Sequence, residues 1–327
     1  MTAPRRRRWL RVGPVGLGVS LPAQADRAIA TSAPVQRLVK PLVHRLTRRD
    51  RSQGPPSPSA NGHIPSAVAA VPAVRRGSES TALEARVAGI DWYHTIDLGH
   101  GVVTRGKVDH RPQLALYQLP ESLAGMRCLD VATMDGFWAY EMERRGAAEV
   151  VGIDVARRID VDLPYGVREE LVRTGQDGPA SGGFGLAHEV LGSKVKKVSI
   201  SVYDLSPEVV GEFDFIFLSD LLLHIRDPQL ALEKVRSVCR GVLHIADVCD
   251  PELDSFGDLC LAEYPLYETG KYYWWWRMNV STIRRMLAVA GFERVVELSR
   301  LRLNLTRVQQ AHLPAKIVLQ ARVPGAR

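Results

Sequence analysis

The chain has 327 residues, 46% of them apolar, so it is long enough to bury a sizeable core. Its net charge of +7 is unevenly spread: residues 1–80 hold 14 Lys/Arg and 3 Asp/Glu, whereas residues 81–327 hold 29 and 33. A body that grips nucleic acid usually carries its own basic surface, so a mildly acidic body disfavours that class of partner. No run of about 18 uncharged apolar residues is present, so we expect no membrane span.

Residues 1–80 are predicted to form a disordered basic tail. They carry ten of the twenty prolines, centred on "QGPPSPSANG", and such a composition buries too little apolar surface to offset the entropy of ordering. The first residues, "RRRRWLRVGPVGLGVSLPAQA", have the arginines and small-residue end of an export signal, but Arg11, Pro14 and Pro22 interrupt the apolar part. We therefore favour a tail, or an upstream start codon, over export.

The four cysteines, Cys128, Cys239, Cys249 and Cys260, form no CxxC pair. This spacing disfavours a metal site, and we predict none. Scattered thiols suit a reducing compartment, so the expected location is the cytoplasm.

Ordered structure is expected from residue 81. Residues 81–125 are predicted to hold a short helix and an irregular cap segment, and residues 126–327 a domain of alternating strands and helices. The predicted strands are Arg127–Ala132, Val150–Asp154, Val198–Tyr203, Phe213–Ser219, Val242–Ala246, Phe292–Leu298 and Lys316–Arg322. The predicted helices are Trp138–Arg145, Tyr165–Arg173, Gly185–Leu191, Pro228–Val238 and Val280–Ala290.

This alternation indicates an α/β fold with a Rossmann-like, doubly wound, mostly parallel sheet of seven strands. The last two strands have no helix between them. They are therefore predicted to form an antiparallel C-terminal edge.

The turn after the first strand, "DVATMDG", lacks the G-x-G-x-x-G pattern of dinucleotide sites. Asp130 ends the strand, Ala132 and Thr133 enter the turn, and Gly136 opens the next helix. A dinucleotide needs its pyrophosphate against bare backbone amides. S-adenosylmethionine carries no phosphate and tolerates a less open turn, so the missing glycines favour this cofactor over a nicotinamide dinucleotide.

Three strands run into an aspartate. We expect Asp130 near the ammonium of the cofactor, Asp154 near the ribose hydroxyls and Asp204 at the adenine amino group, with Val155 and Leu205 beside the last two. The alternative for Asp154 is a strand-end cap. The alternative for Asp204 is an Asx turn that caps the next helix.

Two segments supply the catalytic candidates. "FDFIFLSDLLLHIRDP" places Ser219 at a strand end and His224 just after it, where a histidine with a near-neutral pKa can take a proton. The alternative is a histidine that only shapes the pocket, since methyl transfer can proceed by proximity and orientation. "DWYHTIDL" places Trp92, Tyr93 and His94, the second catalytic candidate, in a segment that either folds over the cofactor or fills the outer face of the sheet.

The run "YETGKYYWWWRMNV" contains Trp275 and Arg277, which are candidates for substrate binding. Aromatic side chains interleaved with cations can stack bases or form the wall of an aromatic small-molecule pocket. A buried structural cluster is the third interpretation.

"LDVATMDGFWAYEMERRGAAEVVGIDV", "VYDLSP" and "FDFIFLSDLLLHIRDPQLALEKVRSVCRG" resemble the class I S-adenosylmethionine-dependent methyltransferases. "WYHTIDLGHGVVTRG" and the Phe–Trp pair after Gly136 resemble a bacterial family labelled as similar to the tRNA wobble-uridine carboxymethyltransferase. The resemblance covers about residues 82–323. It implies transfer of a methyl group from S-adenosylmethionine to an oxygen or nitrogen nucleophile.

The chain departs from these families at two places. Ala132 and Met134 stand where the superfamily has glycines. Leu223 precedes His224, where the carboxymethyltransferase has a tyrosine that holds the extra carboxylate of its cofactor. Leucine cannot donate that hydrogen bond, so plain S-adenosylmethionine is favoured.

We therefore expect a methyltransferase that acts on a small-molecule acceptor more readily than on tRNA. The alternatives are a tRNA wobble-uridine methyl- or carboxymethyltransferase and a non-catalytic Rossmann-like binding module. The identity of the acceptor and the oligomeric state stay open at this point.

Overall fold

The computed structural model describes residues 7–12, 15–20, 78–269, 272–306 and 314–325. The chain divides into two compact units, residues 1–73 and 74–327. Each is described by itself.

In the first unit, β1 (Arg7–Val12) pairs antiparallel with β2 (Val15–Ser20). This hairpin lies within residues 1–80, which the sequence predicts to form a tail without a core of its own. Two short runs containing Val and Leu flank a Gly–Pro dipeptide, a turn signal that an argument from overall composition passes over. The remainder of the predicted tail, residues 21–77, lies outside the described residues.

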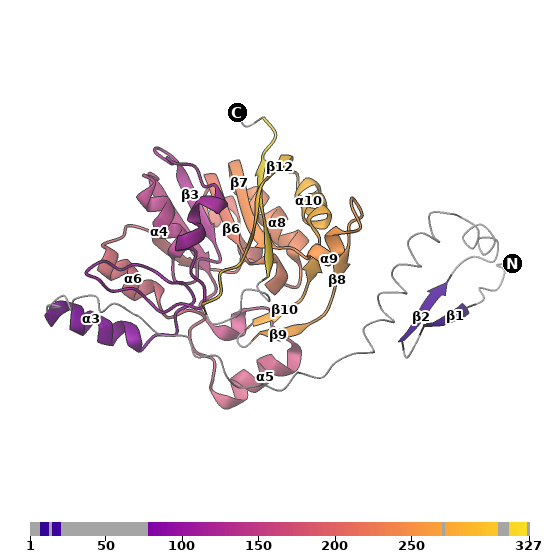
Figure 1. The fold of residues 1–327 in the computed structure, drawn as a ribbon, viewed down its shortest axis with the longest axis horizontal. Coiled ribbons are helices and arrows are strands. Elements are labelled where there is room, and N and C mark those ends of the chain that lie inside the picture. Colours follow the sequence, from indigo (N-terminus) through magenta and orange to yellow (C-terminus); the bar gives the residue numbers. More distant parts are fainter. Residues whose placement is uncertain (1–6, 13–14, 21–77, 270–271, 307–313, 326–327) are drawn as a thin grey trace, which may run out of the picture. The chain divides into compact units, whose positions relative to one another are not determined.

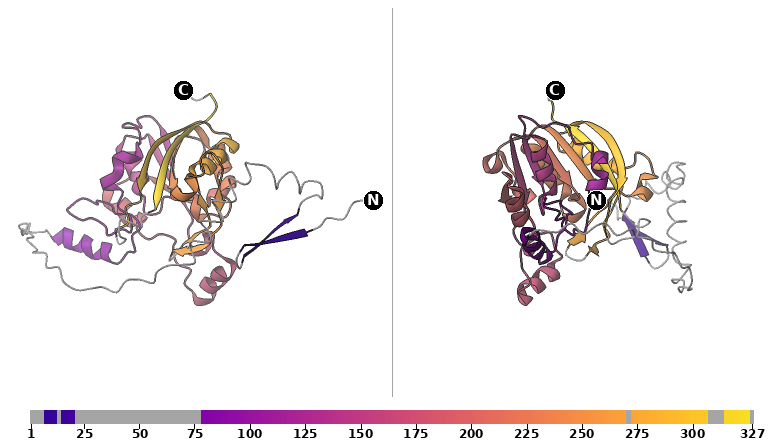
Figure 2. Two further views of the ribbon diagram at one scale, coloured as in Figure 1. Left: turned by 45° about the vertical axis from the view of Figure 1, so that its right-hand side comes forward. Right: turned by 60° about the vertical axis from the view of Figure 1, so that its left-hand side comes forward.

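The second unit is built on a seven-stranded sheet with the order β12-β13-β7-β6-β3-β4-β5 in the described part of the chain. The strands are β3 (Arg127–Val131), β4 (Glu149–Asp154), β5 (Lys196–Ser199), β6 (Phe213–Ser219), β7 (Cys239–Val248), β12 (Glu293–Arg302) and β13 (Ala315–Arg322). The first five pair in parallel, and β13 runs antiparallel to both β7 and β12. The predicted Rossmann-like sheet with its antiparallel C-terminal edge is confirmed (Figure 2).

Helices cover both faces of this sheet (Figure 1). The α-helices are α3 (Ser78–Ala88), α4 (Phe137–Arg144), α5 (Tyr165–Thr174), α6 (Phe184–Leu191), α7 (Pro207–Val210), α8 (Pro228–Ser237), α9 (Pro251–Asp254) and α10 (Val280–Val289). Side chains of α4 and α6 join one buried apolar cluster, and those of α8 and α10 join another on the opposite face. None of the described helices is long and apolar enough to cross a membrane.

Short strands follow α9, namely β8 (Ala262–Glu263), β9 (Tyr267–Thr269), β10 (Tyr272–Trp274) and β11 (Arg277–Met278). They form two small antiparallel pairs, β9 with β10 and β8 with β11. The aromatic run of the sequence thus forms part of a hairpin and the strand after it.

The predicted position of one strand is wrong. The third predicted strand, Val198–Tyr203, is instead β5, Lys196–Ser199, and Val202–Asp204 forms a 3-10 turn. The alternating pattern of "VSISVY" is typical of a strand. The turn forms because the Ser201 hydroxyl accepts a hydrogen bond from the Tyr203 N–H, a local interaction that competes with strand pairing.

Candidate functional site

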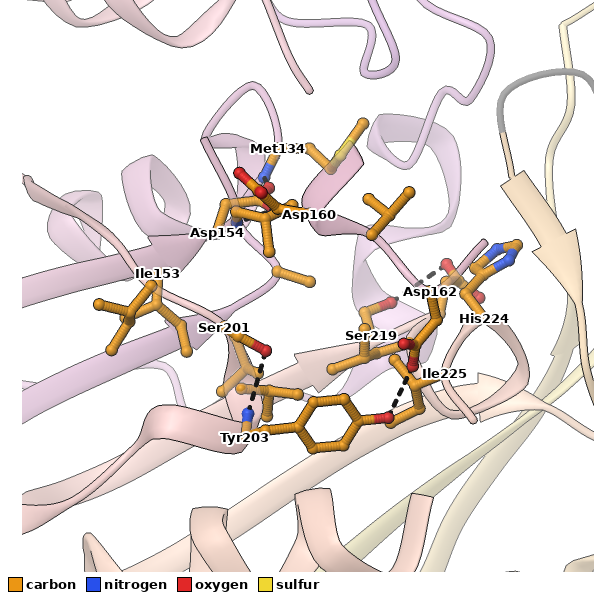
Figure 3. Close-up of a pocket in the computed structure, with 18 of the residues that line it drawn as sticks. Met134, Ile153, Asp154, Asp160, Asp162, Ser201, Tyr203, Ser219, His224 and Ile225 are labelled. Atoms are coloured by element: carbon orange, nitrogen blue, oxygen red, sulfur yellow. Dashed lines mark hydrogen bonds between the residues drawn. The ribbon is translucent and has the colours of Figure 1, made fainter. Parts of the chain in front are cut away.

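A pocket lies beyond the C-terminal ends of β3, β4, β5 and β6. The strand order reverses at β3, and in such open α/β sheets ligands bind at this switch point. Figure 3 shows Met134 and Asp154 at one side of the pocket and Ser219 and His224 at the other. The predicted site residues that line it are Tyr93, His94, Ala132, Asp154, Val155, Ser219 and His224.

The turn after β3 has the backbone conformation of a glycine turn without its glycines. Ala132 has a φ of 62° and Met134 a φ of 50°, and both line the pocket. Residues with a Cβ rarely adopt this left-handed region, and when they do the strain concentrates at functional sites. At the two positions where the chain departs from the family pattern, the backbone therefore adopts the left-handed conformation that glycine favours.

Gly136 also has a positive φ, of 93°, as the residue that precedes α4. A Cβ built there would lie 2.6 Å from the ring of Tyr140. The glycine is required by packing at the start of the helix, and it is not among the residues that line the pocket.

Asp130 lies behind the turn rather than in the pocket. Its carboxylate accepts hydrogen bonds from the Thr133 hydroxyl at 2.7 Å and from the Ala139 N–H at 3.1 Å. Burial raises the pKa of Asp130 to about 7. Asp130 and Thr133 thus tie the turn to α4, and neither is among the residues that line the pocket, so the role of Asp130 beside the ammonium of a cofactor stays a prediction.

Asp154 faces the pocket from the end of β4. Its two carboxylate oxygens accept hydrogen bonds from the main-chain N–H groups of Met134, at 2.7 Å, and Val155, at 2.8 Å. Burial raises the pKa of Asp154, while these hydrogen bonds lower it. Each carboxylate oxygen has two lone pairs, so the group keeps the capacity to accept hydrogen bonds from ligand hydroxyls.

Asp204 does not reach the pocket, because β5 ends earlier than predicted. Its side chain is exposed, and Leu205 is fully buried in the core. Ser201 and Val202, directly after the strand, line the pocket in their place. The sequence held no strong signal for them, since "SVYD" places the more conspicuous aspartate three residues later.

The wall opposite the turn is fixed by Asp162. Its carboxylate accepts hydrogen bonds from the Tyr203 hydroxyl and the Arg226 N–H, both at 2.7 Å. Trp275 is buried behind this wall and donates its indole N–H to the Asp162 carbonyl at 3.0 Å. Trp275 therefore supports the pocket from outside.

Arg277 also lies away from the pocket. Its guanidinium is paired with Asp250 and Glu263, which join β11 to α9 and β8. The prediction that Trp275 and Arg277 contact substrate is therefore not matched by their positions, because each is held by structural partners.

Residues 89–110, here called the strap, both pack on the sheet and reach the pocket. Trp92 is buried, donates its indole N–H to the Val87 carbonyl and packs so closely on Gly183 that a Cβ there would lie 2.4 Å from its ring. The next residues, Tyr93 and His94, line the pocket. Their N–H groups donate to the carboxylate of Asp135, within the turn after β3, at 2.6 and 3.0 Å.

The two histidines differ in what they can do. His224 lies 3.0 Å, at Nδ1, from the carbonyl oxygen of Tyr273. A carbonyl only accepts, so Nδ1 carries the proton and Nε2 carries the lone pair. Burial lowers the pKa of His224, which keeps it neutral. For His94, burial and the charge of Lys316 lower the pKa to about 3, which makes it a weak base.

Sequence reasoning missed a buried ion pair at the end of β6. The ammonium of Lys316, on β13, is fully buried and lies 2.7 Å from a carboxylate oxygen of Asp220. It also donates to the Ser219 hydroxyl at 3.1 Å. Asp220 lines the pocket and has a φ of 52°, a strained conformation that aspartate tolerates better than most residues. The available signal was a lysine inside the apolar strand "AKIVLQAR".

Within the described ranges, no group of three or more His, Cys, Asp or Glu side chains is placed to hold a metal ion.

The model of the protein family described as "Methyltransferase domain" matches residues 105–298, more than half of the chain. The chain belongs to this methyltransferase family. The matched residues of the methyltransferase domain include the turn after β3, Asp154 and Asp220. Tyr93 and His94 precede the matched region and Lys316 follows it.

Two curated relatives match the methyltransferase domain over shorter stretches. The magnesium-protoporphyrin O-methyltransferase of Rhodobacter capsulatus is 29% identical over 115 residues, which is 35% of this chain and 41% of that protein. The ubiquinone biosynthesis O-methyltransferase of Dechloromonas aromatica (strain RCB) is 34% identical over 108 residues, 33% of this chain and 37% of that protein. The chain thus spans about two fifths of the length of the relatives it matches.

Among solved structures, the methyltransferase domain is similar to the N-terminal domain of EvdMO1, crystallised in the presence of SAH and D-fucose. The TM-score is 0.51 at 17% identity, and the likeness covers 76% of this chain and all of that one. At this identity the likeness concerns the fold.

Proposed function

We propose that this chain binds S-adenosylmethionine in the pocket and transfers its methyl group to an oxygen or nitrogen nucleophile of a small-molecule acceptor. One observation carries the proposal: the Asp154 carboxylate accepts a hydrogen bond from the main-chain N–H of Met134, in the left-handed turn. Both residues line the pocket at the switch point of the sheet. The family membership supports methyl transfer, and both curated relatives are named as O-methyltransferases.

The residues of the pocket fit the parts of this cofactor. Asp154 would accept hydrogen bonds from the ribose hydroxyls, and the segment at Ser201 and Val202 would border the adenine. The turn at Ala132 and Met134 carries side chains where a phosphate-binding loop needs bare backbone, and S-adenosylmethionine has no phosphate. When bound, the cofactor supplies an electrophilic methyl group on a sulfonium.

Plain S-adenosylmethionine fits better than its carboxylated form. Leu223, at the position where the carboxymethyltransferase has a tyrosine, is 2% exposed and is not among the residues that line the pocket. Its side chain offers no hydrogen bond to an additional carboxylate. A methyl group is therefore the group that we expect to be transferred.

His224 and Ser219 belong to the acceptor side of the pocket. Because the Tyr273 carbonyl fixes the tautomer of His224, its Nε2 is the nitrogen that would accept a hydrogen bond from a nucleophile and orient it. Tyr93 and His94, held by Asp135, would border the reacting groups from the strap and help to exclude water.

The experiment is a labelling reaction with S-adenosylmethionine carrying a ¹³C-methyl group. The purified chain is incubated with a low-molecular-weight metabolite fraction or with bulk tRNA, and the products are separated and observed by NMR. We expect the label in a small molecule. Asp154→Ala serves as the control for pocket-dependent transfer.

Label that enters tRNA alone would replace the small-molecule acceptor with the tRNA one, and label that enters neither would contradict methyl transfer. Binding of tRNA is measured in parallel at several salt concentrations with the full chain and with residues 78–327. Since residues 81–327 are mildly acidic, we expect only weak, salt-sensitive attachment that depends on residues 1–77.

A further inference from the structure

We infer that Asp220 takes the proton of the methyl acceptor, and that the acceptor is a neutral compound that presents a hydroxyl group with a second oxygen close by. This inference rests on the proposed function and names the acceptor class for that same pocket. It is carried by the buried Asp220–Lys316 pair and by buried polar atoms of the same pocket that have no hydrogen-bond partner among the described residues.

In the described part of the chain, one carboxylate oxygen of Asp220 accepts two hydrogen bonds and the other accepts none. Its Oδ2 accepts hydrogen bonds from Lys316, at 2.7 Å, and from Ser219, at 3.2 Å. Its Oδ1 is buried and has no hydrogen-bond partner among the described residues. The side chain is 8% exposed, and the residue lines the pocket. A buried carboxylate oxygen without a donor is costly, so its donor is expected to be a ligand.

Lys316 supplies the counter-charge of this carboxylate without making the pocket cationic. Its ammonium is fully buried, and although burial lowers the pKa of Lys316, the charge of Asp220 contributes to a net pKa above the ordinary value. Lys316 and Asp220 together are neutral. His94 and His110 nearby are held neutral by burial and by the Lys316 charge, which lower the pKa of both. A second buried carboxyl, Asp247, is engaged by the main-chain N–H groups of Leu221 and Leu222.

Two other residues that line the pocket have buried polar atoms without a partner in the described structure. These atoms are the indole Nε1 of Trp138 and the Nδ1 of His94. An indole N–H can only donate, and a carboxylate oxygen can only accept. The pair Trp138 Nε1 and Asp220 Oδ1 is thus complementary to a ligand with one oxygen that accepts and one hydroxyl that donates.

These features select for the acceptor's charge. A second carboxylate or a phosphate would meet the Asp220 carboxylate without a cation to offset it, because Lys316 is already paired and no Lys or Arg is among the described residues that line the pocket. A neutral phenol or sugar hydroxyl, with a neighbouring oxygen toward Trp138, satisfies both groups. Phenols and sugars share this chemistry, and the experiment distinguishes them.

In the transfer step, the acceptor oxygen forms a bond to the methyl carbon while the carbon–sulfur bond breaks. The electron pair of that bond stays on sulfur, which becomes a neutral thioether. The hydroxyl proton passes to Asp220 Oδ1. The sulfonium charge and the carboxylate charge are both neutralised, so charge and atoms balance with no further reactant.

The test uses calorimetry on the full chain with S-adenosylhomocysteine and then, on the saturated protein, with catechol, methyl glucoside or benzoate. We expect catechol or methyl glucoside to bind and benzoate not to bind. In Asp220→Asn, affinity for the bound probe should fall about tenfold or more, while affinity for S-adenosylhomocysteine stays within about twofold. Asp204→Asn, an exposed carboxylate that is not among the residues lining the pocket, is the control and should change neither affinity.

The double variant Asp220→Asn/Lys316→Met removes both charges and keeps the test valid if the single variant folds poorly. Loss of S-adenosylhomocysteine affinity on removing Asp220, as expected for Asp154→Ala, would assign the carboxylate to the ammonium of the cofactor and overturn the inference. So would unchanged probe affinity, binding of neither neutral probe, or preferential binding of benzoate. Failure of the unsubstituted chain to bind S-adenosylhomocysteine would instead contradict the proposed function.

Discussion

The carboxylate of Asp154 accepts a hydrogen bond of 2.7 Å from the main-chain N–H of Met134, so the end of β4 holds the turn that follows β3. The turn after β3 and the aspartate at the end of β4, which both line the pocket, are therefore held together by this hydrogen bond. A change at Asp154 is expected to act both on ligand hydroxyls and on the conformation of the turn.

Replacing Asp154 with Ala should weaken binding of S-adenosylhomocysteine by about 1–3 kcal/mol, the usual cost of leaving buried polar groups without partners. Calorimetry measures this directly. The matched control is Asp204→Ala, an exposed aspartate outside the pocket, which should leave the affinity unchanged. Equal effects of the two substitutions would remove Asp154 from the binding site.

Replacing Ala132 with Gly should raise the free energy of unfolding by about 0.5–1 kcal/mol. The substitution relieves roughly 1–2 kcal/mol of left-handed backbone strain and costs roughly 0.4–1 kcal/mol through the unfolded chain. Urea denaturation provides the measurement. Ala139→Gly, within α4, is the control and should instead lower stability by about 1 kcal/mol. A loss of stability in both variants would show that the turn is not strained.

The fold could be predicted well where patterns are local. Apolar runs separated by amphipathic segments place six of the seven strands of the sheet close to their observed positions. β5 was misplaced because "VSISVY" alternates like a strand, whereas the Ser201 hydroxyl closes a turn.

Replacing Lys316 with Met should lower the free energy of unfolding by about 3–5 kcal/mol, because it leaves the buried Asp220 carboxylate without its counter-charge. The double variant with Asp220→Asn should recover much of this loss, since no uncompensated charge remains. Chemical denaturation of the double variant and of each single variant gives the comparison. If the double variant is as unstable as the sum of the single ones, the two residues do not act as a pair.

Asp130 predicts a pH dependence of stability. Its folded pKa of about 7 lies above the unfolded value of about 3.9, so the folded state binds the extra proton between these values. The contribution of Asp130 to the free energy of unfolding is therefore lost as pH rises from about 4 to about 7. Asp130→Asn keeps an oxygen for Thr133 and Ala139 and should lose less stability over that window. Parallel curves of unfolding free energy against pH would contradict the raised pKa.

The site could be predicted only in part, because it depends on which way each strand-end side chain points. Asp154, Ser219 and His224 follow from strand position alone. Asp130 lies near the end of a strand as well, but its carboxylate faces α4. Asp204 is the last residue of the 3-10 turn that follows β5. Lys316 joins Asp220 across 96 residues, and no local pattern encodes that contact.

The central claim is that the pocket selects S-adenosylmethionine. Native mass spectrometry of the full chain, incubated with equal concentrations of S-adenosylmethionine, its carboxylated form and NAD, tests it most directly. We expect one bound S-adenosylmethionine per chain, with the adduct diminished in Asp154→Ala. A bound NAD, or a chain that retains none of the three, would contradict it.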